Sequence, residues 1–322
     1  MNDRMQEGLV NAYKESGYLP EWSSPGHRAS MIGNNSASVV ADALVTNRTG
    51  KPKSETAIYA QRAMNYKNLF DPTTKLMRGK KADGSFVANF DPSAWSREYT
   101  EGNAWHWSFC VFHDPQGLID LMGGNKSFVS MLDTVFVIPS YEGMKSRSMI
   151  HEMREMQVMN MGQYAHGNQP IQHMPYLYNY AAEPWKAQYW VRKIMDKLYL
   201  PTPDGYCGDE DNGQTSAWYV FSSLGFYPVS PGSGEYVIGS PQFDKVTLKL
   251  ENGKEVRIHA KQERGDQVYV NQLSWNGKAY EKNYIRYSDL LKGANLEFKM
   301  STEPNKNRGT KKDDAPYSFS NE

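Results

Sequence analysis

The 322-residue chain has little cysteine, no long apolar run and no excess of charge of either sign. Its two cysteines, Cys110 and Cys207, form neither a disulfide framework nor a zinc site. Thirty-six basic residues balance 36 acidic ones, which excludes a general electrostatic grip on nucleic acid or anionic membrane. No apolar run approaches the roughly 20 residues of a membrane span, and the first 20 residues lack the apolar core of a signal peptide.

Aromatic residues are abundant instead, at 13% with 21 Tyr and 8 Trp. Such rings pack between helices or stack on sugar rings, and composition does not choose between the two. The first two-thirds of the chain predicts helices joined by loops, because apolar residues recur at helical spacing. The expected helices cover 5–13, 36–44, 54–70, a segment opened by the cap Asp114-Pro115, 184–198, and 215–224 with its end at Gly225.

After Pro231 the period of apolar residues changes from 3.6 to 2. Two Asn-Gly pairs, at 252–253 and 276–277, predict hairpin turns between the alternating runs. We therefore expect a mainly α chain with a β tail. Its parts are a helical portion with active-site loops over 1–231, an antiparallel β region over 232–301, and a polar, flexible tail over 302–322.

Polar residues concentrate in three segments that the sequence predicts as loops, 99–103, 151–169 and 208–213. The third contains three consecutive acids, a pattern that suits a solvated turn as well as a functional site. Carboxylates on separate loops suit a glycosidase, in which one acid protonates the departing oxygen and another activates water. A carbohydrate-binding module would show the same aromatics and acids without catalysis, and spacing alone leaves this choice open.

Two metal motifs fail on spacing. Counted from Asp209 as an EF-hand loop, Gly213 falls fifth where the sixth position needs glycine, and Val220 replaces the bidentate Glu at position twelve. The run from His151 to Glu155 lacks the second His of a zincin. A buried histidine with satisfied hydrogen bonds is the commoner explanation of His151.

These same segments resemble glycoside hydrolase family 92, the calcium-dependent exo-acting α-mannosidases. The resembling strings run in order through nearly the whole chain: SGYLPEWSSPG (16–26), MIGNNSASVVADA (31–43), YTEGNAWHW (99–107), 151–192 and 203–241. The resemblance implies part of an (α/α)6 barrel followed by antiparallel strands, which pack with an N-terminal β-sandwich. No β-rich segment precedes the first helix here, so we expect this sandwich half to be missing from the chain.

The resemblance also implies roles for residues at matching positions. Glu101 matches the general acid, and Asp209 and Asp211 match the acids assigned to the base in a single-displacement, inverting mechanism. Residues that match positions holding the terminal mannose are Arg78, His151 and Glu152. For the calcium ion the candidate oxygen ligands are Glu155, Asn168 and Gln169.

The implied function is hydrolysis of terminal α-linked mannose, of the α-1,2-mannosidase kind, on N-glycans or mannan outside the cytoplasm, periplasmic or secreted. Two departures bear on it: Ala37 replaces an acidic residue, and Gln169 replaces a Glu of many members, which removes a charge near the metal. Glu101 favours ordinary glycosides, since a sugar alkoxide is a poor leaving group that needs an acid. Two alternatives remain open, an inactive fragment and a carbohydrate-binding protein that keeps the sugar pocket.

Overall fold

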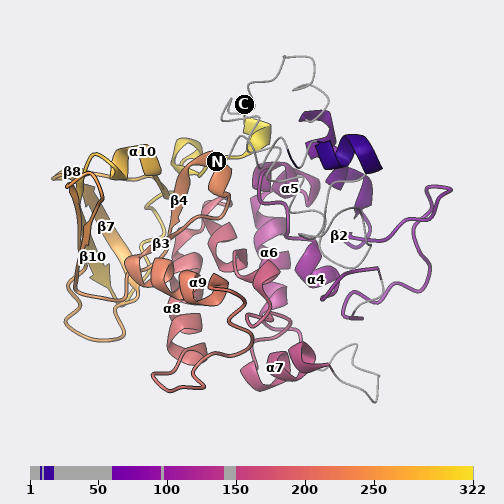
Figure 1. Cartoon of the computed structure of the whole chain (residues 1–322), viewed down its shortest axis with the longest axis horizontal. Helices are drawn as coiled ribbons and strands as arrows, with labels where there is room; N and C mark the ends of the chain where they lie inside the picture. Colours follow the sequence, from indigo (N-terminus) through magenta and orange to yellow (C-terminus); the bar gives the residue numbers. More distant parts are fainter. Residues whose placement is uncertain (1–7, 9–10, 18–59, 96–97, 141–149, 322) are drawn as a thin grey trace.

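A computed structural model describes residues 8, 11–17, 60–95, 98–140 and 150–321. Its helices gather on one side of a twisted sheet, as Figure 1 shows, with α5, α6 and α8 in the middle of the molecule and α7 at its lower edge. Between residue 98 and the sheet the α-helices are α4 (Ala104–Trp107), α5 (Pro115–Leu121), α6 (Asn125–Val135), α7 (His151–Met159), α8 (Pro184–Leu198) and α9 (Gln214–Leu224).

The expected helix signals at Asp114, 184–198 and 215–224 are confirmed. The Asp114 carboxylate accepts a hydrogen bond from the Gly117 amide (3.2 Å), and Pro115 occupies the first helical position of α5. Helix α9 ends at Gly225, whose φ of 95° lies in the left-handed region that glycine adopts without strain.

Other helix predictions fall partly or wholly on residues that the structure does not describe. The expected helix over 36–44, with Ala37, lies outside the described residues, as do positions 54–59 of the next one. Residues 60–63 are helical as expected, and the chain then continues as a 3-10 helix, η1 (Met64–Leu69), and a short hairpin of β1 (Phe70–Asp71) and β2 (Leu76–Met77).

The segment over 151–169 is not all loop, which corrects the expectation. Its first nine residues form α7, whose stripe of Met153, Met156 and Met159 is buried. Three apolar residues at i, i+3 and i+6 make one helix face, and packing of that face outweighs the polar residues between them. The 3-10 helix η2 (Gln169–Ile171) begins at the last residue of the segment, and η3 (Met174–Asn179) follows it.

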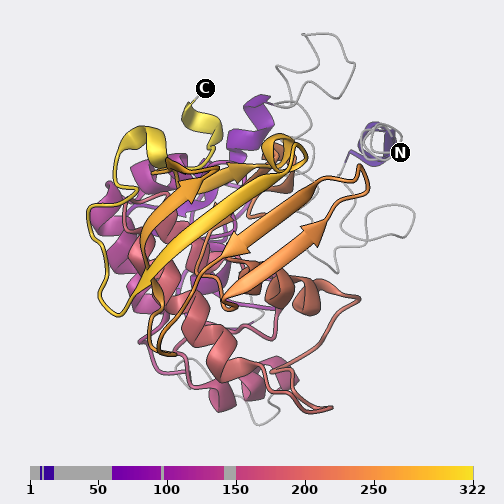
Figure 2. The same cartoon turned by 90° about the vertical axis from the view of Figure 1, so that its left-hand side faces the viewer.

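The β region forms two sheets. The larger has the order β5 (Lys245–Lys249), β6 (Glu255–His259), β10 (Ala294–Ser301), β7 (Tyr269–Trp275) and β8 (Lys278–Ala279). The smaller joins β3 (Phe226–Tyr227), β4 (Glu235–Ile238) and β9 (Tyr284–Arg286), and the short helix α10 (Tyr287–Leu290) follows it. Figure 2 shows the larger sheet in front of the helices.

Both Asn-Gly turns are confirmed as hairpins, while the purely antiparallel expectation is wrong for one strand pair. Asn276 and Gly277, with φ of 49° and 79°, form the two-residue turn between β7 and β8. Gly253, with φ of 77°, closes the turn between β5 and β6. β10 lies between β6 and β7 and pairs parallel with β6 but antiparallel with β7.

The helices and the larger sheet share an interface along α8. The Val270 amide of β7 donates to the side-chain oxygen of buried Gln188 (2.9 Å), and the Arg192 guanidinium donates to the carbonyl of Pro241 (3.0 Å). Apolar side chains of β10 at alternate positions, among them the fully buried Leu296, form a second core with the neighbouring strands, against which Phe221 and Leu224 of α9 pack. No helix in the described part is long and apolar enough to cross a membrane.

The polar segment after residue 301 packs on the molecule, which corrects the expectation of a flexible tail. Arg308 is 3% exposed and donates to the carbonyls of Tyr280 and Lys282. Further on, the Ser318 hydroxyl donates to Asp114 (2.8 Å). These residues are held by hydrogen bonds from their polar side chains to partners far away in the sequence. The segment therefore packs on the molecule without the apolar pattern by which buried segments are usually predicted.

Candidate active site

The segment that carries Glu101 is anchored by the short helix α4. The Asn103 side chain caps this helix by accepting from the amides of Trp105 (3.0 Å) and His106 (3.4 Å). His106 accepts at Nδ1 from the Asn103 amide (3.1 Å) and donates from Nε2 to the carbonyl of Gln163 (2.6 Å). Burial lowers the pKa of His106 to about 4, so this anchor is neutral near pH 7.

Glu101 itself has an unusual backbone. Its φ of 48° lies in the left-handed region that side chains other than glycine seldom adopt, at a cost on the order of 1–2 kcal/mol. Two hydrogen bonds hold it there: Trp107 Nε1 donates to the Thr100 carbonyl (2.8 Å), and Asn168 Nδ2 donates to the Glu101 carbonyl (2.6 Å). Strain that is held in this way is typical of functional positions.

The next residue after Asn168 reaches a second acidic segment. Gln169 Nε2 donates to the carbonyl of Asp209 (3.2 Å). Because Asn168 and Gln169 are neighbours in the chain, their side chains link the backbone of Glu101 to the backbone of Asp209. The structure therefore joins two of the three polar segments through the side chains of Asn168 and Gln169.

Residues 208–213 form a tight loop before α9, and we call them the acidic loop. Asp211, Asn212 and Gly213 all have positive φ, at 53°, 56° and 96°. The Glu210 carboxylate accepts from the amides of Gly213 (2.7 Å) and Ser216 (3.2 Å), which caps the helix. Hydrogen bonds from the Ser216 side chain and then from the Gly213 amide hold the pKa of Glu210 below its usual value. Glu210 thus acts in the fold, and the side chains of Asp209 and Asp211 remain exposed.

Helix α7 supplies the third group of polar side chains. His151 Nδ1 lies 3.1 Å from Glu155 Oε1, and its Nε2 lies 3.4 Å from Glu152 Oε1. The hydrogen bond to Glu155, helped by the charges of Glu152 and Asp209, raises the pKa of His151 despite partial burial. The His151 side chain is 59% exposed, so it is not a core histidine.

These groups act on one another electrostatically. Burial, followed by the negative charges of Glu152 and Asp211, raises the pKa of Glu101, while the positive charge of His151 opposes the shift. A carboxyl group that is half buried beside two other acids keeps its proton to higher pH than an ordinary glutamic acid. This is the property that a proton donor needs, and it is typical of catalytic acids.

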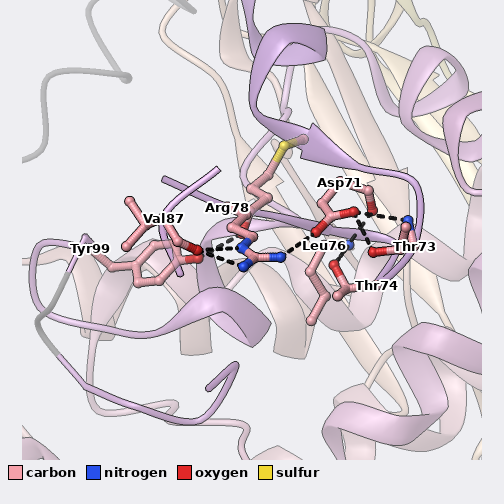
Figure 3. Close-up of polar contacts among 8 residues, drawn as sticks. Asp71, Thr73, Thr74, Leu76, Arg78, Val87 and Tyr99 are labelled. Atoms are coloured by element: carbon pink, nitrogen blue, oxygen red, sulfur yellow. Dashed lines mark hydrogen bonds and ion pairs between the residues drawn. The ribbon is translucent and has the colours of Figure 1, made fainter. Parts of the chain in front are cut away.

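Arg78 is held in a different set of contacts, drawn in Figure 3. Its Nη1 donates to Asp71 (2.9 Å), and its Nε and Nη2 both donate to the Val87 carbonyl (2.9 and 2.5 Å). The guanidinium carbon also lies 4.9 Å from the ring centre of Phe90. Within the described residues, none of these contacts joins Arg78 to Glu101, and they hold the hairpin of β1 and β2 against the loop that follows.

The residues predicted for calcium offer hard oxygen atoms. Asn168 and Gln169 donate with their amide nitrogens, which leaves their side-chain oxygens for a cation. Glu155 reaches the backbone of the acidic loop, since a Cβ on Gly208 would lie 2.7 Å from its Oε2. Glu152 Oε2 is buried without a hydrogen-bond partner among the described residues. This donor chemistry fits calcium, although no group of three or more His, Cys, Asp or Glu in the described ranges is arranged around a metal.

Two buried polar residues next to the acids were not singled out by the sequence. Thr215 and Gln172 are both fully buried and link the acidic loop to the segment that ends at η2. The available signal was weak: a hydroxyl in the first turn of a helix and an amide between apolar residues are common in any protein. Their partners are distant in the sequence, so only the fold shows the connection.

The three polar segments, 99–103, 151–169 and 208–213, supply the charged groups around Glu101, a partly buried acid with a raised pKa. Such an arrangement defines a glycosidase-like site. Residues 1–51 and 45–302 match the family model described as the glycosyl hydrolase family 92 catalytic domain, and the chain belongs to this family.

Solved structures agree with the family match. The chain is 41% identical to a family GH92 inverting mannosidase of Bacteroides thetaiotaomicron, with a TM-score of 0.80 over 99% of this chain and 52% of that one. It is 31% identical to a GH92 α-mannosidase of the same organism in complex with mannoimidazole, with a TM-score of 0.78 over 98% of this chain and 50% of that one.

A curated relative is more distant. An uncharacterized secreted glycosidase of Arthroderma benhamiae is 27% identical over 292 residues, which cover 81% of this chain and 34% of the fungal protein. The chain thus spans about a third of this relative and about half of the two mannosidases that it matches.

Proposed function

We propose that the protein hydrolyses terminal α-linked mannose by a single displacement that inverts the anomeric centre. The observation that carries this proposal is the meeting of Glu101 and the 209–211 loop on the adjacent amides of Asn168 and Gln169. A family GH92 inverting mannosidase at 41% identity supports the same chemistry. The carbohydrate would be the non-reducing end of an N-glycan or a mannan.

In the proposed reaction Glu101 protonates the glycosidic oxygen, which would otherwise leave as an unstable alkoxide. The raised pKa of Glu101 supports this role, because the group must be protonated when substrate binds. Asp209 or Asp211 removes a proton from the attacking water on the opposite face of the sugar. Inversion requires the acid and the base to lie about 6.5–9.5 Å apart, which leaves room for that water.

The remaining predicted residues bind the sugar and the cation. Glu152 and His151 stand beside Glu101 in the electrostatic cluster and would accept and donate hydrogen bonds to mannose hydroxyls. Arg78 remains a proposed sugar contact and would have to leave part of its set of partners. Glu155, Asn168 and Gln169 would hold calcium, and such an ion would supply a hard positive charge that binds sugar hydroxyls.

The family fold supports two further proposals about the whole protein. Helices α4 to α9 would belong to an (α/α)6 barrel, and an N-terminal β-sandwich would complete the pocket, since the matched mannosidases are about twice as long as this chain. We also propose that the protein acts outside the cytoplasm, in the periplasm or after secretion, and the secreted fungal relative supports this location.

The direct test follows the product anomer by proton NMR during hydrolysis of an α-mannobioside. We expect β-mannose to appear first and then to equilibrate with the α form. The assay uses the 322-residue chain alone and joined to the N-terminal half of a family member. Release of α-mannose first would contradict inversion. Mannose binding without turnover in either form would identify a carbohydrate-binding protein, and neither binding nor turnover would identify an inactive fragment.

Calcium dependence has its own test. Glu155 lies on the surface helix α7, and Asn168 and Gln169 stand at the start of η2. None of them holds the helical core together, so we expect a chelator to abolish turnover and leave the helical circular dichroism signal unchanged. Added calcium should restore the rate. Full activity after exhaustive chelation would contradict the calcium proposal without affecting the assignment of Glu101.

A further inference from the structure

The carbonyl oxygen of Asp209 receives two side-chain hydrogen bonds, although it belongs to an exposed loop residue. Thr215 Oγ1 donates to it at 2.9 Å, and Gln169 Nε2 donates to it at 3.2 Å. The Thr215 amide also donates to the carbonyl of Glu210 (3.1 Å). Thr215, on the first turn of α9 and fully buried, therefore holds two successive carbonyls of the acidic loop.

The hydroxyl of Thr215 is oriented by Gln172. Gln172 Nε2 donates to Thr215 Oγ1 (3.1 Å) and to the carbonyl of His166 (3.2 Å). A carbonyl only accepts, so this second bond fixes which end of the Gln172 amide faces the site. Because an amide nitrogen only donates, the Thr215 oxygen accepts there and directs its own proton at Asp209.

Gln172 is itself fixed in the core. It is fully buried, and its main-chain carbonyl accepts a hydrogen bond from Trp218 Nε1 (2.8 Å). The chain of hydrogen bonds thus runs from the buried indole of α9 through Gln172 and Thr215 to the backbone of Asp209. A chain whose members are all satisfied and buried is rigid, and rigid support is what a precisely placed catalytic group needs.

The acidic loop has a reason to need this support. Asp211 and Asn212 both have left-handed backbones, with φ of 53° and 56°, which store strain beside the proposed base. Within the described part of the chain, no hydrogen bond holds the Asp209 carboxylate itself, so its direction depends on its backbone. A loop of this kind relaxes unless neighbouring groups hold it.

We propose that Thr215 is a positioning residue that fixes Asp209 for water activation through its hydrogen bond to the Asp209 carbonyl, with Gln172 orienting its hydroxyl. The expected effect of Thr215 on turnover rests on the proposed function. The effect on the loop is a separate, measurable property. Thr215 touches neither substrate nor the reacting atoms, so it is not a catalytic residue.

The experiment compares Thr215→Val, which keeps the shape and removes the hydroxyl, with Thr215→Ser, which keeps the hydroxyl. Thr134→Val is the matched control, because its hydroxyl bonds the Ser130 carbonyl within α6 (2.7 Å). We expect Thr215→Val to lower kcat on an α-mannobioside about tenfold, the equivalent of one buried hydrogen bond, with KM changed less than about twofold. Thr215→Ser should restore most of the rate, and the control should match the parent.

Amide hydrogen exchange separates this proposal from the function. In Thr215→Val, exchange at 209–213 should become faster while exchange in α8 stays the same, because only the loop loses its support. Unchanged exchange in the loop would overturn the positioning role, and so would faster exchange with unchanged kcat. If the parent is inactive both alone and joined to the N-terminal half of a family member, while its loop exchange still responds to Thr215→Val, the mannosidase proposal is overturned and the support of Asp209 stands.

Discussion

Asp114 and Glu101 are two carboxylates of the same helical region in opposite circumstances. Asp114 is fully buried at the start of α5 and accepts hydrogen bonds from five groups: the Tyr66, Ser318 and Ser320 hydroxyls and the Ser320 and Gly117 amides. Burial would raise the pKa of Asp114, but these donors outweigh it and hold the pKa below its usual value. In Glu101, burial and neighbouring acids raise the pKa together.

The difference separates a carboxylate that holds the fold from one that is kept ready for chemistry. Asp114 ties the end of the chain to α5 and is stabilised as an anion. Glu101 has no such set of donors among the described residues and has a strained backbone beside two further acids. A folded protein retains such an unfavourable arrangement at sites where it serves a function. The pair therefore predicts opposite results for the same kind of substitution.

The largest effect is expected at the proposed base. Asp209→Asn and Asp211→Asn should each slow hydrolysis by about 10²- to 10⁴-fold if the residue activates water, and equally for good and poor leaving groups. Activity close to the parent in both variants would remove the acidic loop from the mechanism. Thermal unfolding serves as the control, since both side chains are exposed and should contribute little to stability.

A smaller but clear effect is expected on stability at Asp114. Asp114→Asn replaces an acceptor by a donor facing Tyr66 and Ser320, so we expect a loss of about 2–4 kcal/mol in the free energy of unfolding at pH 7. The pKa of Asp114 is lower in the folded protein than in the unfolded chain, where it is about 3.9. The stability that the Asp114 carboxylate contributes is therefore present above about pH 3.9 and is lost as the pH falls through the folded pKa.

Two control variants sharpen the Asp114 result. Asp83→Asn changes an exposed Asp whose hydrogen bonds go to nearby Ser85, and it should leave the free energy of unfolding nearly unchanged. Glu101→Gln should leave the melting temperature unchanged or raise it at pH 7, because it removes a carboxyl that ionises with difficulty in the fold. A large fall in the melting temperature of Glu101→Gln would show that Glu101, like Asp114, stabilises the fold.

The smallest effect concerns the pH profile. Removing the charge of Glu152 should lower the pKa of Glu101, so the basic limb of kcat/KM should move to lower pH in Glu152→Gln. We expect the movement to be less than about one unit, as is usual for one partly screened charge. Glu251→Gln, which removes an equal charge from the β5–β6 turn, should leave the limb unchanged. A shift in the opposite direction would contradict the electrostatic cluster.

The sequence predicted the local features of this fold well, because each depends on neighbours along the chain. The cap at Asp114, the Asn276-Gly277 hairpin and the end of α9 at Gly225 all follow from a residue's own backbone preferences. The stripe of Met153, Met156 and Met159 gave the same kind of signal for α7. The polar residues between these methionines concealed it, and the segment was predicted as a loop.

Features that depend on distant partners could not be predicted in this way. The C-terminal residues around Ser318 and Ser320 bind a carboxylate about 200 positions earlier, as shown by sequence separations of 204 and 206. Pairing of β6 with β10 likewise needs a crossover that no local pattern encodes. The acidic residues of the site were found through the family resemblance, whereas Thr215 and Gln172 became visible only when the fold brought them to Asp209.

Substrates with different leaving groups show whether Glu101 donates the proton to the glycosidic oxygen. Glu101→Gln and the parent are compared on an α-mannobioside and on an aryl α-mannoside with an activated leaving group. We expect a loss of about 10²- to 10⁴-fold on the disaccharide and a far smaller loss on the aryl substrate, whose departure needs no acid. Equal losses on both substrates would contradict it.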